Sequence, residues 1–430
     1  MAEDTHVGNL VRRVRRAPFW KPLAVRDLRL LWVGDSISIL GDQFYFVALP
    51  WLTLQLTGSG LALGTVLMAA AVPRAVLMLV GGAVSDRFSP RAIMIVSNVL
   101  RALLMAAFTV LIVVDAIQLW HLYALSGLFG VVDAFFFPAI FSTVPKLVEK
   151  DQLEASNALL QSTGQLMMLV GPAPAGVLAA TVSLAAVFGI GAAAFVIAAL
   201  IIRLMAEGDL GGPVRQQGEE DAADEPADSA GLLADVMEGL RYAWNDPAIR
   251  AIVILLAALD TAFYGPIDVG LVSLADRRFV GGSKAFGIML SAHGGGALLG
   301  ALLGGSIKRP RRLGPLLLLY IPGVLGVGLA LLGLASHILV AVALLAVMGV
   351  VGGVYGVMVI TWLQARAEPD MVGRLMSLVM LASYGAAPFS FVMAGALVDR
   401  GISLMYGVAG GILLITTAIA STSRTVRTLE

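Results

Sequence analysis

The chain has 430 residues, of which 58% are hydrophobic and only 13% charged, and its mean hydropathy is +0.89. A soluble globular domain of this size could not carry so much apolar surface in water, so the composition excludes a soluble enzyme and indicates that lipid surrounds most of the chain. The formal net charge is zero and cysteine is absent, which excludes disulfides and thiol chemistry.

Apolar runs long enough to cross a bilayer recur along almost the whole chain. A spanning helix needs about 20 mostly apolar residues, and a spanning segment must be helical to satisfy its own backbone groups. Twelve spans are expected. They cover residues 28–56, 61–85, 92–114, 120–144, 155–180, 184–205, 248–274, 286–307, 313–335, 338–365, 372–398 and 404–421.

Polar segments divide the spans into two sets of six. We expect a basic N-terminus at 1–27, a first bundle at 28–206, a linker at 207–247, a second bundle at 248–422 and a short tail at 423–430. The linker is rich in Gly, Pro, Glu and Asp and is predicted to be flexible, with an amphipathic helix near residues 232–244.

Basic residues predict the orientation, because Lys and Arg gather on the cytoplasmic side of spans. If the spans alternate, most bases fall on one side, and Arg277, Arg278, Lys284 and Arg400 fall on the other. Both termini are therefore predicted to be cytoplasmic, in a bacterial cytoplasmic membrane. The basic N-terminus reads as a topology signal, so no nucleic-acid partner is expected.

The two halves repeat each other at a constant shift of 219 residues. Gly130-Val131-Val132 matches Gly349-Val350-Val351, and Gly176 matches Gly395 in the same register. The predicted fold class is therefore an all-α polytopic membrane protein with twelve transmembrane helices in two pseudo-symmetric six-helix bundles. Parallel repeats of this kind are typical of transporters that rock around a central substrate path.

Ionisable residues in the middle of spans are costly and usually face a cavity or a partner. Counting along the spans places five such residues near mid-bilayer, with a sixth, Asp35, nearer the cytoplasm on almost the same helix face as Asp42. The five are Asp42, Arg74, Arg101, Asp133 and Asp260.

These charges predict proton coupling. Desolvation raises the pKa of a carboxyl group and a nearby guanidinium lowers it, so a carboxyl whose distance to an arginine changes can bind and release a proton. Asp42 is the first candidate for the proton carrier, followed by Asp133 and Asp260. The alternative is that Asp42 and Asp133 form permanent structural pairs with Arg74 and Arg101.

Five segments carry a resemblance to a known family. The chain resembles the major facilitator superfamily, and within it the branch of macrolide-efflux, enterobactin-exporter and Tap-like multidrug efflux proteins. The resemblance covers nearly the whole chain and rests on residues 40–44, 50–52, 82–91, 133–139 and 171–176.

The resemblance implies roles for further residues. In the loop between spans two and three, Gly82, Asp86, Arg87 and Arg91 would form a cytoplasmic gate, although Ser89 and Pro90 depart from the family pattern. In the fifth span, Gly171, Pro172 and Gly176 partly match a helix-packing motif of drug/proton antiporters. The cavity would be lined by aromatic side chains, with these candidates: Tyr45, Phe46, Phe136, Phe137, Tyr264, Tyr355 and Trp362.

The leading hypothesis is a proton-coupled exporter of amphipathic drugs or natural products that works as a monomer. A dedicated siderophore or metabolite exporter of the same fold, or a non-transporting membrane sensor, remains open. An ATP-driven pump is disfavoured because there is no phosphate-binding loop, and an enzyme because there is no nucleophile with its base. No cofactor is implied, and four scattered histidines indicate no metal site.

Overall fold

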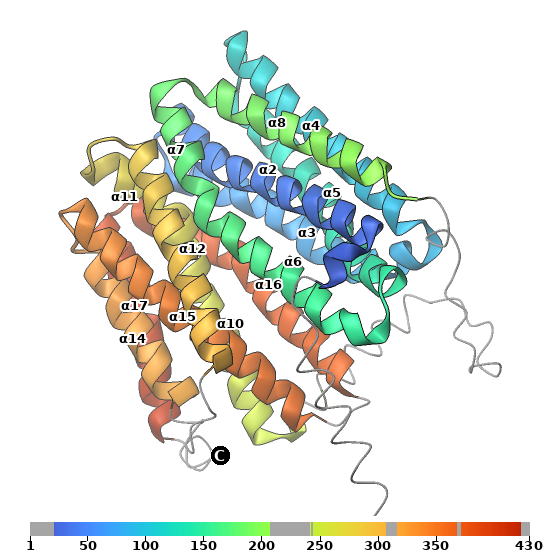
Figure 1. Ribbon diagram of the computed structural model, residues 1–430. Helices are drawn as coiled ribbons and strands as arrows, with labels where there is room; N and C mark the ends of the chain where they lie inside the picture. Colours follow the sequence, from blue (N-terminus) through green and yellow to red (C-terminus); the bar gives the residue numbers. More distant parts are fainter. Residues whose placement is uncertain (1–20, 207–240, 242–243, 307–315, 368–370, 423–430) are drawn as a thin grey trace, which may run out of the picture.

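The apolar runs fold as helices in the computed structural model, which describes residues 21–206, 241, 244–306, 316–367 and 371–422 (Figure 1). Within these ranges, eleven helices or joined helices are long and apolar enough to cross a bilayer. The shorter α14 (Ile321–Leu332) follows the π-helical turn η4 (Leu316–Tyr320) and takes the place of the remaining predicted span.

The first half of the chain, here called the N-half, contains two short segments of 3-10 helix. The first, η1 (Lys21–Ala24), precedes its helices, and the second, η2 (Lys150–Gln152), lies between two of them. Its helices are α2 (Arg26–Thr57), α3 (Gly60–Arg87), α4 (Pro90–Val113), α5 (Leu119–Leu147), α6 (Leu153–Val170), α7 (Pro172–Thr181) and α8 (Leu184–Arg203).

The C-half follows the linker. Besides η4 and α14, its elements are α10 (Pro247–Gly265), the π-helical turn η3 (Pro266–Gly270), α11 (Leu271–Arg278), α12 (Ser283–Ser306), α15 (Ile338–Arg366), α16 (Val372–Val398) and α17 (Ile402–Thr422). Most of the predicted linker with its amphipathic helix, the N-terminus up to residue 20 and the tail lie outside the described residues.

Two predicted spans are interrupted. The fifth is split into α6 and α7 at Gly171, because Pro172 has no backbone N–H to continue the hydrogen-bond ladder. The seventh changes from α to π geometry at η3 before it continues as α11, and π turns of this kind are frequent at functional sites.

The helices alternate in direction, so the structure has two ends. At one end, here called the Asp399 end, lie the turns that follow α2, α4 and α16. The helix α3 begins at this end, and α11 and α16 end there. The opposite end, called the Lys21 end, holds the ion pair between Lys21 and Asp151, with 3.6 Å between Nζ and Oδ2.

The repeat predicted from the sequence places glycines at equivalent contacts. Within the halves, a β-carbon on Gly130 would lie 3.0 Å from Cα of Ala70 in α3, and one on Gly349 would lie 3.0 Å from Cα of Gly296 in α12. The 219-residue shift therefore relates two close helix pairs, α5 with α3 and α15 with α12.

The other glycine pair of the repeat joins the two halves. A β-carbon on Gly176 of α7 would lie 3.0 Å from Cα of Gly287 in α12, and one on Gly395 of α16 would lie 3.0 Å from the carbonyl carbon of Gly60 in α3. Both contacts lie toward the Asp399 end. The halves thus meet there through two pseudo-equivalent helix pairs whose backbones approach closely because neither partner has a side chain.

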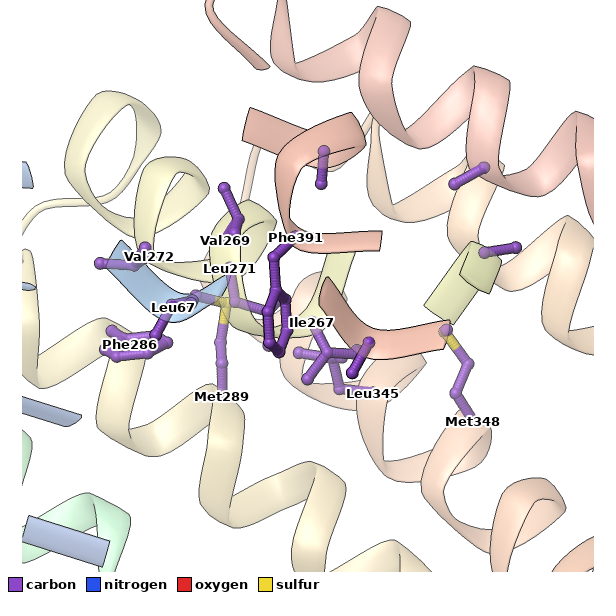
Figure 2. Packing of buried hydrophobic residues seen from close by; sticks show 14 of the residues in the cluster. Leu67, Ile267, Val269, Leu271, Val272, Phe286, Met289, Leu345, Met348 and Phe391 are labelled. Atoms are coloured by element: carbon purple, nitrogen blue, oxygen red, sulfur yellow. The ribbon is translucent and has the colours of Figure 1, made fainter. Parts of the chain in front are cut away.

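Buried apolar side chains fill the space behind these contacts. One cluster includes residues of both halves, among them Leu67 of α3, Phe391 of α16 and Met289 of α12. Figure 2 shows Leu67 among side chains of the C-half such as Phe286 and Leu271. The halves are therefore packed together in this region.

Candidate functional site

The four mid-span charges of the N-half come together in one cluster of ion pairs. Asp133 on α5 accepts from two arginines, with 2.7 Å between its Oδ1 and Nη2 of Arg101 and 3.0 Å between its Oδ2 and Nε of Arg74. Arg101 on α4 also contacts Asp42 on α2, with 3.4 Å between Nη1 and Oδ2. Four helices of the N-half thus meet in a single charged network.

Arg101 is the centre of this cluster and has 0% exposed side-chain surface. Its guanidinium lies over the ring of Phe136 at 4.2 Å, and the rings of Phe129 and Phe195 lie at 5.8 and 5.6 Å. Cation–π contacts stabilise a desolvated guanidinium, so the aromatic residues help to keep this charge inside the bundle.

The carboxyl groups outnumber the guanidinium groups in the cluster. Asp35 lies about two turns before Asp42 on α2, is 6% exposed and interacts electrostatically with Arg101. Asp35, Asp42 and Asp133 therefore share two cations, Arg74 and Arg101. Because an unmatched buried charge is costly, the cluster is electrically balanced when it holds one proton.

Arg74 connects this cluster with the C-half. Its side chain is 27% exposed, and its guanidinium lies 5.2 Å from the ring centre of Tyr384 on α16. Arg74 is therefore positioned between the N-half acids and the C-half aromatic residues.

Asp260 of α10 belongs to the C-half and does not join the N-half ion pairs. It accepts a hydrogen bond from Ser383 of α16 and interacts electrostatically with Tyr264 and Tyr355. Asp268, two turns along on the π-helical turn η3, also interacts with Tyr264. The described part of the C-half thus has acids at depth, but its arginines, such as Arg277 and Arg278, lie at the helix end.

The aromatic candidates for a cavity wall divide into two groups. Phe46 and Phe137 are each 41% exposed and lie one turn beyond Asp42 and Asp133 on the same helix faces, and Tyr264 is half-buried. The others are packed inside the bundles in this conformation, where they support neighbouring residues and do not line open space: Tyr45, Phe136, Tyr355 and Trp362.

The family-derived gate residues lie at the Lys21 end. Gly82, Asp86 and Arg87 occupy the last turns of α3, and their side chains are outside the described residues. Arg91 in the first turn of α4 donates a hydrogen bond of 2.6 Å to the carbonyl oxygen of Arg203 at the end of α8. This contact stays within the N-half.

The fifth-span motif has two distinct environments. Gly171 faces α2, where a β-carbon would lie 2.6 Å from Cβ of Gln43. Gly176 faces α12 of the other half, and the carbonyl oxygen of Pro172 lies against Gly287. The backbone amide of Ala173 also donates a hydrogen bond to Oγ of Ser291 in α12 at 3.0 Å. The motif is therefore part of the contact between the halves.

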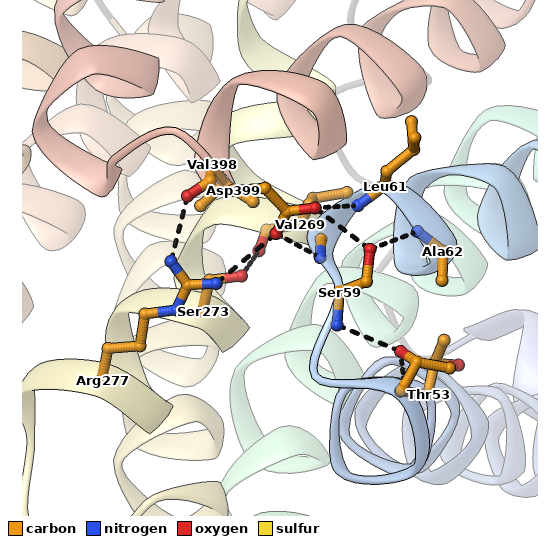
Figure 3. A network of polar contacts seen from close by, with 11 residues as sticks. Thr53, Ser59, Leu61, Ala62, Val269, Ser273, Arg277, Val398 and Asp399 are labelled. Atoms are coloured by element: carbon orange, nitrogen blue, oxygen red, sulfur yellow. Dashed lines mark hydrogen bonds and ion pairs between the residues drawn. The ribbon is translucent and has the colours of Figure 1, made fainter.

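A polar network between the halves was not anticipated from the sequence (Figure 3). Asp399, the residue after α16, accepts hydrogen bonds from the backbone amides of Gly60 and Leu61 and from the hydroxyl of Ser59, and it pairs with Arg277. An acid at a helix end is ordinary in a sequence, and only Ser59-Gly60, a typical helix start, could have suggested a cap at this place.

The sequence and fold were compared with known proteins. The Major Facilitator Superfamily model matches residues 31–390. The "Multidrug efflux pump Tap" of Mycolicibacterium fortuitum is 29% identical over 371 residues, which cover 84% of this chain and 86% of that protein. The "Enterobactin exporter EntS" of Shigella boydii is 25% identical over 351 residues, covering 81% of this chain and 79% of that protein.

Among solved structures, the nucleoside transporter NupG is similar in fold. It superposes with a TM-score of 0.73 at 11% sequence identity, covering 94% of this chain and 100% of that one. At this identity the similarity concerns the arrangement of helices alone.

Proposed function

This chain belongs to the Major Facilitator Superfamily, and from that premise we propose that it is a proton-coupled exporter of amphipathic drugs or natural products. Its relatives include efflux pumps, and the fold is that of an integral membrane transporter. In the proposed cycle, the two halves rock about a central site that opens to one side of the membrane at a time.

One observation supports the proposed proton coupling: Asp42 and Asp133 share Arg101 and Arg74 in the middle of the N-half, and a third buried carboxyl group, that of Asp35, lies nearer the Lys21 end of α2. Asp42 is the proposed carrier because its contact with Arg101, at 3.4 Å, is longer than the 2.7 Å contact of Asp133. Asp133 is held by two arginines, so its proposed part is to keep Arg74 and Arg101 in place. Asp35 and Asp260 are further proposed proton sites.

Protonation and substrate binding would alternate. When a proton neutralises Asp42, Arg101 loses one of its partners and the charge balance of the cluster changes, which biases the packing of α2 against α4 and α5. Each proton that enters down a membrane potential of about 100 mV supplies about 2.3 kcal/mol, enough to drive appreciable accumulation of an exported compound.

The proposed orientation follows the positive charges and places the Lys21 end in the cytoplasm. Gly82, Asp86, Arg87 and Arg91 then stand at the cytoplasmic end of the path as the proposed gate. The exposed rings of Phe46 and Phe137, together with Tyr264, are the proposed apolar contacts for the substrate. The proposed working unit is a monomer.

A second candidate is a dedicated siderophore or metabolite exporter, which the similarity to the enterobactin exporter favours. The two candidates differ in the range of compounds transported. A sensor without transport is less well supported, since it has no need of an unmatched carboxyl group deep in the membrane.

The test uses purified protein in proteoliposomes with an imposed pH gradient. We expect uptake or release of a cationic dye or a macrolide that follows the gradient and stops when a protonophore dissipates it. Transport of a siderophore alone would favour the dedicated exporter. Gradient-independent movement of every compound tested would contradict proton coupling.

A further inference from the structure

Asp399 caps a helix that belongs to the other half of the protein. Its Oδ1 accepts from the amide of Gly60 at 2.7 Å, and its Oδ2 accepts from the amide of Leu61 at 3.0 Å and from Oγ of Ser59 at 3.0 Å (Figure 3). Gly60 and Leu61 are the first two residues of α3, so the carboxylate satisfies amides that have no partner within their own helix.

The first turn of α3 is thereby completed by residues of both halves. Ser59 precedes α3, and its hydroxyl accepts from the amide of Ala62 at 3.2 Å, as an N-cap does. Asp399 takes the two amides that Ser59 does not reach. The negative charge also lies at the positive end of the helix dipole, where an anion is stabilised.

Arg277 fixes the carboxylate from the C-half side. Its Nη1 donates to the carbonyl oxygen of Val398 at 3.0 Å, and its Nη2 lies 3.5 Å from Oδ1 of Asp399. One guanidinium thus binds both the end of α16 and the acid that follows it. Arg277, a residue of the same half, therefore holds the Asp399 carboxylate where it contacts the start of α3.

The pKa of Asp399 agrees with a carboxylate held in its charged form. Desolvation raises this pKa, but the hydrogen bonds from Gly60, Leu61 and Ser59 and the charge of Arg277 together bring it below its usual value. Charged acceptors make stronger hydrogen bonds than neutral ones, so the cap is strongest in this state.

Close approach of the two helices depends on Gly60. A β-carbon at this position would lie 3.0 Å from Oδ1 of Asp399 and 3.0 Å from the carbonyl oxygen of Gly395. Any side chain would therefore push α16 away from the start of α3. The cap by Asp399 therefore depends on the close approach of α16 to the start of α3 that Gly60 permits.

We propose that Ser59, Gly60, Leu61, Asp399 and Arg277 form a latch, here called the Asp399 latch, that holds the two halves together at the Asp399 end and must open when the protein opens there. The latch rests on the proposed rocking function for its part in the cycle. The hydrogen bonds named at the Lys21 end, such as Arg91 with Arg203 and Arg26 with Leu204, instead join residues of a single half.

The absence of cysteine allows a direct test with spin labels on the full chain. Cysteines replace Leu56 of the N-half and Val280 of the C-half, which are 40% and 102% exposed at the Asp399 end and lie outside the latch. The distance between the labels is measured in lipid nanodiscs by double electron–electron resonance, without substrate and without a pH gradient.

We expect the unsubstituted latch to give mainly the short distance. Asp399→Asn removes the charge that pairs with Arg277 and replaces one accepting oxygen by an NH2 group, so it should raise the ratio of long to short distances roughly fivefold, the effect of losing about one hydrogen bond. Asp115→Asn is the control, because Asp115 is an exposed acid in the turn after α4 at the same end. A ratio in Asp399→Asn equal to that of the control would overturn the latch.

If Asp399→Asn does not fold, Gly60→Ala tests the same contact from α3. It leaves every charge in place and is expected to raise the long-distance ratio because its β-carbon collides with Cγ1 of Val398 and also meets the carboxylate of Asp399. An unchanged ratio would equally overturn the proposal. Since no transport is measured, a failure of the proposed export function and a failure of the latch give separate results.

Discussion

Arg101 of α4 and Asp133 of α5 form the shortest ion pair of the mid-span cluster, with 2.7 Å between Nη2 and Oδ1, and no part of the Arg101 side chain is exposed. Removing one partner of such a pair leaves an uncompensated buried charge, which typically costs about 3–5 kcal/mol. This relationship makes Arg101 a structural requirement of the N-half.

We therefore predict that Arg101→Gln lowers the free energy of unfolding by about 3 kcal/mol or more. The double variant Arg101→Gln with Asp42→Asn should recover part of this loss, because Asp133 keeps its contact with Arg74 whereas Asp42 loses its ion-pair partner. Reversible unfolding in mixed micelles measures both. A loss below about 1 kcal/mol in the single variant would show that the pair is not buried in the way described.

Arg74 is expected to behave differently, since it is partly exposed and lies between the halves. Arg74→Gln should reduce gradient-driven transport by tenfold or more, roughly the effect of about 1.4 kcal/mol, while unfolding changes less than in Arg101→Gln. Initial transport rates and unfolding are measured on the same preparations.

Tyr384 supplies a matched pair of variants for the contact with Arg74. Tyr384→Phe keeps the ring beside the guanidinium but removes the hydroxyl that is hydrogen-bonded with Arg74, so it should retain part of the activity, whereas Tyr384→Leu removes both contacts and should retain less. Equal activity of the two variants would contradict a role for the cation–π contact.

The glycine contact between α7 and α12 makes a steric prediction. A leucine at Gly287 would collide with the backbone of Pro172 and Gly176 and should keep the halves apart at the Asp399 end. The label pair at positions 56 and 280 should then show mainly the long distance. Gly305→Leu is the control, since it lies on the same helix and its β-carbon would meet nothing within 4 Å.

The Asp399 latch predicts a specific pH dependence. A carboxyl whose pKa is lowered in the closed state stabilises that state above the pKa of the open state, and this contribution is lost as the pH falls through the lowered value. The charged side chains beside Asp399 are those of Arg277, which pairs with it, and of Arg400, the next residue in the chain.

The part of the closed fraction that depends on Asp399, taken as the difference between the unsubstituted protein and Asp399→Asn, should therefore stay constant between about pH 8 and pH 5 and fall only below about pH 4. Label distances across this range measure it, with Asp399→Asn as the variant in which the fall is absent. A transition centred near pH 6 in both proteins would assign the pH dependence to other groups.

Much of the fold could be predicted from the sequence because every segment that spans a lipid bilayer must be mostly apolar and helical. Apolar length alone indicated the spans, and counting residues along them placed Asp42, Arg101 and Asp133 at similar depth. The constant shift from Gly176 to Gly395 also predicted that these two glycines occupy equivalent positions. In the structure both glycines lie at contacts between the halves.

The pairing of these residues could not be predicted in the same way. Depth says nothing about which face of a helix meets which neighbour, so the sequence did not indicate that Asp133 binds both arginines or that Asp260 stands apart from them. The Asp399 latch depends on two helix ends more than 300 positions apart in the chain, and no local pattern links them.

The central claim is that a carboxyl group in the mid-span cluster carries the coupled proton, and Asp42→Asn tests it most directly. Proteoliposomes containing this variant are compared with the unsubstituted protein and with Asp115→Asn, which makes the same chemical change at an exposed turn. Transport driven by an imposed pH gradient is measured beside substrate exchange without a gradient. We expect Asp42→Asn to lose the gradient-driven transport and to retain the exchange, while Asp115→Asn keeps both. Unchanged gradient-driven transport in Asp42→Asn would contradict the account.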